Sequence, residues 1–409
     1  MKLRHLLMVV QGVMLCLGLV ASAPAGSLLG RVLGLQESSP HAKPYAVLDE
    51  DFEPTSVVWS PDGKYIADDG VLGAEIHVWD VARRSIVKRI ALKYGAAGEF
   101  SGMAWSPDGR YLVAAQAGNH APMLVIDTSD WQPVRLQNGV IIDGLSPAFS
   151  QDGKLLAFVT VGIRQGLRGA NIMRVYRTGT WQLYKELIFR IPDRELYPGW
   201  GFSVDRVAFQ PGTHNLAIGM HGSFGFPPGS PPPVRDANGT ITSDIPSSIR
   251  VIFWNLDGHM PDLMTSDLDH SIVAYKDESW GMQALVFSSN GRQMATGTST
   301  GVGTPHWQST DSVHIYDPNS HALLAAPLDG MDHGGWTDAL GYIDEDKYLL
   351  VGHEDKSGAI DVINTRTFKV AEILDANGFV SSLAVDPSRP RFVVTSNRSL
   401  MIWNFVDKP

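Results

Sequence analysis

Short apolar runs separated by polar turns recur along almost the whole chain, and one stretch shows the pattern most clearly. It begins with the apolar run Val57 to Trp59, continues with the turn sequence Ser60-Pro61-Asp62-Gly63, and returns in a run that starts at Tyr65. Proline presets one central φ of such a turn, and glycine is free to take a positive φ. A further run ends in Val78-Trp79-Asp80. The stretch therefore predicts three consecutive β-strands.

The turn sequence recurs along the chain in seven copies. After the first copy it appears as Ser106-Pro107-Asp108-Gly109, Ser150-Gln151-Asp152-Gly153, Gln210-Pro211-Gly212, Ser288-Ser289-Asn290-Gly291, Asp344-Glu345-Asp346-Lys347 and Asp386-Pro387-Ser388-Arg389. The last three copies depart progressively from the first. Such repetition indicates a repeat fold, because one such sheet cannot bury both of its faces alone.

Two further positions repeat in step with the turn. A large apolar residue stands just before each turn, where we expect it to fill the gap between neighbouring sheets: Trp59, Trp105, Phe149, Phe209, Phe287, Ile343 and Val385. The third strand of each unit ends in a similar way: Val78-Trp79-Asp80, Val125-Ile126-Asp127, Val175-Tyr176-Arg177, Phe253-Trp254-Asn255, Ile315-Tyr316-Asp317, Val362-Ile363-Asn364 and Ile402-Trp403-Asn404. These independent markers agree on seven units.

The spacing of the units predicts the fold. It is near the ~40 to 45 residues of a propeller blade, stretched where loops are inserted. We therefore predict an all-β, seven-bladed β-propeller of four-stranded antiparallel blades. The last unit supplies only three strands, so Tyr45-Ala46-Val47-Leu48 is expected to complete the seventh blade and close the ring. The alternative for this segment is a disordered arm.

With these turns and strand endings, the chain resembles the WD-repeat family and its bacterial relatives with SPDGK-type turns, over nearly the whole mature chain. The resemblance implies architecture rather than activity, since members of the family differ in their partners. The Trp-Asp ending is complete only at Trp79-Asp80, and Gly352-His353 falls on a second strand instead of before a first strand. The Asp-His-Ser/Thr hydrogen-bond network of the family is therefore not expected here.

The first 25 residues have the pattern of a secretory signal peptide. Lys2 and Arg4 precede an apolar stretch from Leu6 to Val20, and small residues follow, so cleavage is expected after Ala25. The alternatives are an uncleaved membrane anchor and a lipid anchor at Cys16, the one cysteine of the chain. We predict an exported protein, periplasmic or extracellular, with a signal peptide at 1–25, a linker at 26–44 and the propeller at 45–409.

Charge narrows the range of partners. The formal net charge is −10, and loss of the leader would make the mature protein more negative. Duplex nucleic acid and anionic lipid both require a basic face, so neither is expected as the main partner. No stable membrane span is expected after cleavage of the signal peptide.

Two long insertions fall in corresponding loops of blades four and five. Residues 222–248 are rich in proline, which forbids regular structure, and residues 298–311 contain His306 and Trp307. Both join the second strand of a blade to the third, and such loops share one face of a propeller with the links between blades. The two inserted loops should therefore cluster on that face, where they could take part in function, although the first could equally be a disordered loop.

The same face collects polar and aromatic candidates for binding. They are His120, His221, Trp280, His306, Trp307, Trp336, His353 and Glu354, accompanied by Asp68, Asp69, His270, Asp332, His333 and Asp355. A ring of imidazoles and carboxylates around the channel could hold a metal ion, but no pair has a diagnostic spacing, and loop histidines are usually solvated. The aromatic residues could rim a pocket or simply plug the core.

No nucleophile elbow, haem-attachment sequence, phosphate loop or zinc-protease helix is present. The sequence leaves open whether the protein is an enzyme and favours a non-enzymatic scaffold that binds a protein or envelope component through the loop-decorated face. No cofactor is predicted. The alternative is a metal-assisted hydrolase or lactonase in the central channel, for which Glu53, Asp205 and Asp338 occupy suitable strand starts without a matching motif. A cytochrome- or quinone-linked oxidoreductase is a third, weaker class.

Overall fold

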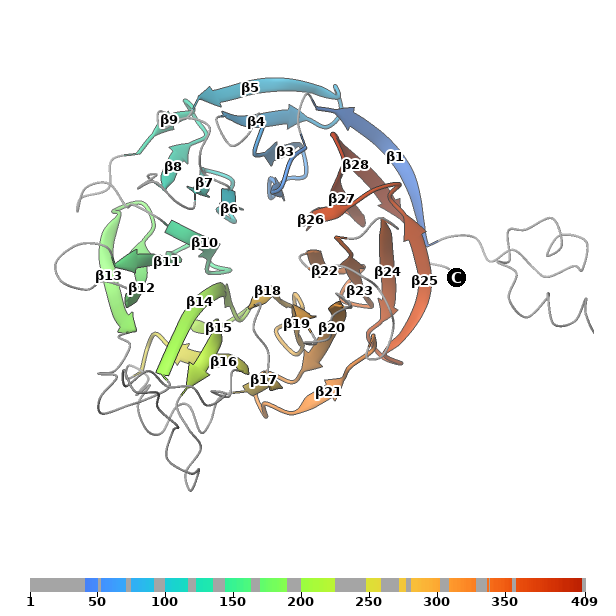
Figure 1. Ribbon diagram of the computed structural model, residues 1–409. Coiled ribbons are helices and arrows are strands. Elements are labelled where there is room, and N and C mark those ends of the chain that lie inside the picture. Colours follow the sequence, from blue (N-terminus) through green and yellow to red (C-terminus); the bar gives the residue numbers. More distant parts are fainter. Residues whose placement is uncertain are drawn as a thin grey trace, which may run out of the picture. The chain divides into compact units, whose positions relative to one another are not determined.

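A computed structural model gives the arrangement of the strands. It describes residues 41–50, 53–70, 75–91, 100–116, 123–134, 144–162, 170–189, 200–224, 248–258, 272–276, 281–301, 309–328, 337, 339–354 and 358–406. The chain divides into two units, residues 44–405 and residues 1–43 with 406–409. In the larger unit, seven four-stranded sheets surround a central axis, as Figure 1 shows. The predicted seven-bladed propeller is confirmed.

The first four blades follow one another in sequence order. Blade one contains β2 (Val57–Trp59), β3 (Tyr65–Asp68), β4 (Glu75–Asp80) and β5 (Ser85–Ala91). Blade two contains β6 (Phe100–Trp105), β7 (Tyr111–Gln116), β8 (Leu124–Asp127) and β9 (Gln132–Pro133). Blade three contains β10 (Gly144–Phe149), β11 (Leu155–Gly162), β12 (Ala170–Arg177) and β13 (Gln182–Phe189). Blade four contains β14 (Trp200–Phe209), β15 (Asn215–Phe224), β16 (Ser248–Asn255) and β17 (Ile272–Lys276).

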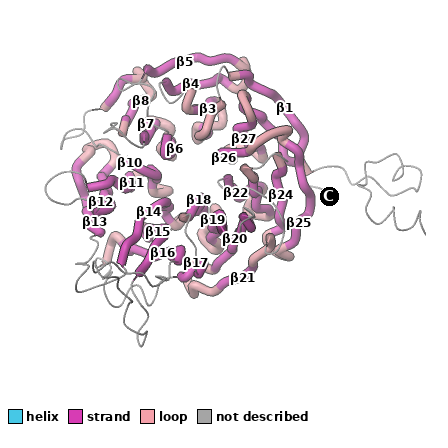
Figure 2. Tube along the Cα trace, viewed as in Figure 1, coloured by secondary structure: helices cyan, strands magenta, loops and turns pink. Residues whose placement is uncertain are grey.

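The last three blades complete the ring, and Figure 2 shows how far strands dominate it. Blade five contains β18 (Met282–Phe287), β19 (Met294–Gly301), β20 (Ser309–Tyr316) and β21 (Leu323–Ala325). Blade six contains β22 (Ala339–Ile343), β23 (Tyr348–Gly352), β24 (Ala359–Asn364) and β25 (Lys369–Asp375). Blade seven contains β26 (Val380–Val385), β27 (Arg391–Ser396), β28 (Ser399–Phe405) and β1 (Ala42–Asp49).

Strand β1 closes the ring as the sequence predicts. The strand order of blade seven is β1-β28-β27-β26, so a segment from the start of the chain forms its outer edge. Along β1, Ala46 and Leu48 are buried while Tyr45 and Val47 are exposed. The two buried side chains pack in one cluster with Trp59 of blade one. This alternation is the pattern of a strand with one face on the core.

The repeated turn owes its shape to three of its residues. In the first copy, the Ser60 hydroxyl donates to Asp62 Oδ1 at 2.7 Å and accepts from the Tyr65 N–H at 2.9 Å. The Gly63 N–H donates to the Ser60 carbonyl at 2.9 Å, and Gly63 takes a φ of +67° that favours glycine. The same serine–aspartate bond recurs in blades two and three, at 2.6 and 2.7 Å. Sequence and turn geometry therefore repeat together.

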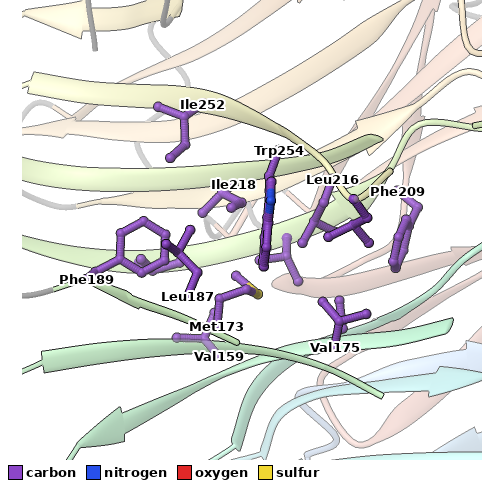
Figure 3. Packing of buried hydrophobic residues seen from close by; sticks show 14 of the residues in the cluster. Val159, Met173, Val175, Leu187, Phe189, Phe209, Leu216, Ile218, Ile252 and Trp254 are labelled. Atoms are coloured by element: carbon purple, nitrogen blue, oxygen red, sulfur yellow. The ribbon is translucent and has the colours of Figure 1, made fainter. Parts of the chain in front are cut away.

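The core lies between neighbouring blades. Between blades three and four, Trp254 of β16 is fully buried beside Met173 of β12 and Leu216 of β15 (Figure 3). Phe209, the apolar residue before the fourth turn, belongs to the same cluster. The expectation that this position fills the gap between sheets is confirmed here.

In blades two, three and six, the turn between the third and fourth strands carries an aromatic residue at a positive φ, Trp131, Trp181 and Phe368. Trp181 of blade three is 4% exposed, and its ring meets that of Tyr111 of blade two edge-on, with centroids 4.8 Å apart. The backbone N–H of Trp181 donates to the backbone carbonyl of Arg177 at 2.8 Å across the turn, and Trp181 has a φ of +54°. Such aromatic residues act as packing elements of the blade edge.

Candidate functional site

The two ends of the propeller differ in which connections between strands they contain. At the turn face, the first strand of each blade turns into the second and the third into the fourth. At the loop face, the second strand connects to the third and each blade connects to the next. Of the eight binding-face candidates, the structure describes three, His221, His353 and Glu354, and these lie toward the loop face. His120, Trp280, His306, Trp307 and Trp336 lie outside the described residues.

Blades three to five reach further toward the loop face than their neighbours. Their second strands β11, β15 and β19 have 8, 10 and 8 residues, whereas β3, β7, β23 and β27 have 4, 6, 5 and 6. Each strand residue adds about 3.4 Å. The pairing continues to Phe224 opposite Trp200 in blade four. These blades therefore form a raised part of the loop face.

The two insertions begin later than the sequence pattern indicates. Gly222 still pairs with Ser248, and in blade five Gly301 pairs with Ser309. The loops that join these strands are thus residues 225–247 and 302–308, which lie outside the described residues. Backbone pairing continues into glycine- and serine-rich sequence because the ladder needs only peptide groups. The strand ends nevertheless place both loops on the loop face of adjacent blades.

His221 pairs with Asp205 within blade four, and Asp205 also binds the backbone of blade five. Its Nδ1 lies 2.8 Å from both carboxylate oxygens of Asp205, and Asp205 Oδ2 accepts the Met282 N–H at 2.9 Å. The hydrogen bond to Asp205 raises the pKa of His221. Gly281, with a φ of +92°, leaves room beside the imidazole, since a Cβ there would lie 3.0 Å from Nδ1. His221 and Asp205, both sequence candidates, are thus partners.

His353 is buried and has a different partner. Its Nε2 lies 3.0 Å from Oδ2 of Asp361 on β24, and both side chains are fully buried. Glu354 follows His353 and is half-buried. A fully buried imidazole cannot touch a partner directly, so His353 supports the loop face from within. The two candidate histidines that the structure describes belong to different blades, and each is paired with its own aspartate.

A group that sequence reasoning did not assemble lies where the closing strand meets blade one. Among the described residues, Glu50, Asp68 and His77 place one ligand-type atom each within 4.8 Å of the others. His77 Nδ1 is 3.0 and 3.1 Å from the two oxygens of Glu50 and 3.7 Å from Asp68 Oδ1. The side chains of His77 and Asp68 are fully buried, and that of Glu50 is 3% exposed.

Neighbouring donors hold this group in place. Trp79 Nε1 donates to Glu50 Oε1 at 3.1 Å and to Asp68 Oδ2 at 2.7 Å. Arg89 Nη1 lies 2.6 Å from His77 Nε2. Because a guanidinium only donates, Nε2 accepts in this arrangement, and the neutral imidazole carries its proton on Nδ1 toward Glu50. Burial, followed by the nearby charge of Glu50, raises the pKa of Asp68 well above its usual range.

Asp69 adjoins the group but has partners of its own. Its Oδ1 accepts the N–H groups of Thr55 and Ser56, both at 2.8 Å, and its Oδ2 accepts the Thr55 hydroxyl. Burial nevertheless raises the pKa of Asp69 to about 6. Asp68 and Asp69 are therefore buried side chains at the end of β3, whereas the sequence places them in a loop at the channel.

One signal in the sequence could have found the group. His77 is a polar residue between the apolar Ile76 and Val78 in the third strand of blade one, and its ring lies over Gly70, where a Cβ would be 2.6 Å from Cε1. Blade six has its histidine–aspartate pair at different positions. Its third strand has Asp361 where blade one has His77, and His353 stands two residues beyond Val351, as Gly70 stands two beyond Asp68.

The turn face also has concave surfaces. A groove of about 470 Å³ lies between blades one and two and is lined by Trp105, Trp131 and Asp108, among others. A second, of about 550 Å³, lies between blades five and six and includes Arg292 and Arg366. Neither contains a residue that the sequence analysis selected for binding.

Comparison with known proteins agrees with this architecture. Residues 368–404 match the family model described as WD domain, G-beta repeat. The match begins one residue before the outer strand of blade six and continues through most of blade seven. A search of curated proteins found no match to the chain. The protein is thus a seven-bladed β-propeller in which residues 368–404 are similar to a WD40 repeat, and WD40 propellers are typically protein-binding scaffolds.

Proposed function

We propose that this protein is an exported, non-enzymatic scaffold that binds another protein or an envelope component through its loop face. The observation that carries the proposal is the asymmetry of that face. Blades three to five have the long second strands. The two inserted loops join strands of blades four and five, which are neighbours within this raised part. Long loops on a rigid scaffold are a common means of recognition.

The export part of the proposal rests on the first 25 residues. They combine two basic residues, an apolar stretch and small residues before the expected cut after Ala25. The described part of the chain contains no helix with the length and apolar character needed to span a bilayer. N-terminal sequencing of the protein from a fractionated culture tests export. A chain that retains residues 1–25 would contradict it.

Deletion of residues 225–247 tests the binding part. The ends to be rejoined are Phe224 and Ser248, which belong to paired strands, so a short Gly-Ser turn can replace the loop without breaking the ladder. We expect a folded propeller, judged by circular dichroism and thermal unfolding, that no longer binds. Partners are first captured with the unaltered protein and identified by mass spectrometry, and each variant is then measured against the purified partner.

A matched variant on the opposite face completes the experiment. Arg292→Ala alters the exposed guanidinium beside the groove between blades five and six and should leave binding intact. Loss of binding in Arg292→Ala together with full binding by the loop deletion would move the interface to the turn face. Hydrolysis of esters or lactones by the purified chain, abolished by a chelator, would instead favour the alternative of a metal-assisted hydrolase.

A further inference from the structure

We propose that Glu50, Asp68 and His77 bind a divalent metal ion of the zinc or manganese class, and that this ion fastens the closing strand of the ring to blade one. One imidazole nitrogen and two carboxylates form a donor set that suits both ions. The site is distinct from the proposed binding loops of blades four and five, so it stands independently of the proposed function.

The separations of His77 Nδ1 from the two carboxylates are close to those that such an ion requires, and all three ligand atoms lie within 4.8 Å of one another. With bonds of about 2.0 to 2.2 Å, tetrahedral ligands lie roughly 3.3 to 3.6 Å from each other. His77 Nδ1 is 3.0 Å from Glu50 Oε1 and 3.7 Å from Asp68 Oδ1, which brackets that separation. Small side-chain shifts would therefore be enough to admit the ion.

An unpartnered oxygen supplies an independent reason. Asp68 is 0% exposed, and its Oδ1 has no hydrogen-bond partner among the described residues, while its Oδ2 is held by Trp79. This free oxygen faces His77 Nδ1, the nitrogen that also faces Glu50. A buried carboxylate oxygen without a partner is costly. A cation between the three side chains would give Asp68 Oδ1 a partner and would compensate the negative charge of the two carboxylates.

The surrounding side chains can support the bound state. Coordination through Nδ1 would place the imidazole proton on Nε2, where Glu75 Oε2 lies 3.3 Å away and can accept it. Arg89, half-exposed and 3.4 Å from the same Glu75 oxygen, would turn from Nε2 to Glu75. A carboxylate on the outer nitrogen of a ligating histidine is the usual arrangement around metals.

The position of the site gives it a structural role. Glu50 directly follows β1, and its N–H donates to the carbonyl of Arg398 in blade seven at 2.8 Å. Asp68 and His77 belong to β3 and β4 of blade one. An ion held by all three would therefore join the end of the closing strand to the first blade. Metal binding should then stabilise the closed ring by mass action.

The test uses the full chain without an affinity tag. The protein is stripped with a chelator, dialysed against Zn²⁺ or Mn²⁺ in separate arms, freed of unbound ion by gel filtration and analysed by inductively coupled plasma mass spectrometry. We expect about one ion per chain and a higher unfolding temperature in its presence. Failure of both metals to bind stoichiometrically would overturn the proposal.

Variants locate the ion. Asp68→Asn keeps the shape of the side chain and should weaken binding at least about 10- to 100-fold, the loss that even outer-sphere changes cause. His221→Gln, which removes a histidine paired with a single carboxylate, should bind like the unaltered chain. Equal affinity in Asp68→Asn and the unaltered chain would show that the ion binds elsewhere.

A spectroscopic measurement on the unaltered chain covers the case in which Asp68→Asn does not fold. X-ray absorption at the zinc edge should show oxygen ligands with one imidazole. Two or more imidazoles would assign the ion to other histidines and contradict the site.

Discussion

The guanidinium of Arg391 donates a hydrogen bond to the carbonyl of Gly63, 328 positions earlier in the chain, at 3.0 Å. Arg391 begins β27 in the last blade, and Gly63 lies in the first turn of blade one. The same guanidinium pairs with Asp386 at 2.6 Å. A Cβ at Gly63 would lie 2.6 Å from an Asp386 oxygen, so glycine permits this approach. The ring is thus joined by side chains as well as by β1.

Removal of this contact should weaken the whole propeller. In Arg391→Met, the fully buried carboxylate of Asp386 loses its partner. Breaking a buried pair in this way costs about 3 to 5 kcal/mol. Urea unfolding near neutral pH measures the change. Arg83→Met, which removes an exposed partner of Asp80, should leave the unfolding midpoint unchanged, and an equal shift in both variants would contradict the argument.

Substitution of Gly70 by alanine should disturb blade one through His77. The added Cβ would stand 2.6 Å from two atoms of the imidazole ring, which is fully buried and cannot simply move aside. Overpacking of this kind costs about 1 to 3 kcal/mol. Gly258→Ala is the control, because its nearest neighbours would be at 3.6 Å. A Gly70→Ala protein as stable as this control would contradict the argument, because it would show that the imidazole of His77 can move aside.

Trp254 should be the most sensitive position of the core between blades three and four. It is the largest fully buried side chain of the cluster drawn in Figure 3. We expect Trp254→Ala to lower the free energy of unfolding by about 3 to 5 kcal/mol. Leu323→Ala, at a side chain that is 53% exposed, should have little effect. Comparable losses in the two urea titrations would argue against the interblade core as the main source of stability.

The His221–Asp205 pair predicts a dependence of stability on pH. The pKa of His221 is raised in the folded protein, mainly by the hydrogen bond to Asp205. The stabilisation that the His221–Asp205 pair gives to the folded protein should therefore be complete below the unfolded pKa of histidine, about 6.5, and should disappear as pH rises through the folded pKa. The difference in unfolding free energy between the unaltered chain and His221→Gln should be larger at mildly acidic pH than at alkaline pH. A difference that grows with pH would refute this assignment.

Most of the fold could be predicted because its signals are local. Ser60, Asp62 and Gly63 determine a turn through contacts within a few residues, and the apolar residue before each turn identifies the side of the strand that faces the next blade. The same holds for the closing strand, whose alternating side chains indicate one buried face. The predicted boundaries of the two insertions were less accurate, because backbone pairing at the loop face continues through Gly222 and Gly301 regardless of side chain.

The sequence by itself determined the number of blades, their turns and the closure of the ring, because each depends on short local patterns that recur from one unit to the next or on the strand missing from the last unit. Only the tertiary structure decided which polar residues meet. Glu50 reaches His77 because closure brings the end of β1 beside blade one, and Arg391 reaches Gly63 because the last blade packs against the first. Such contacts join residues distant in the chain, so their chemistry is set by the geometry of the ring.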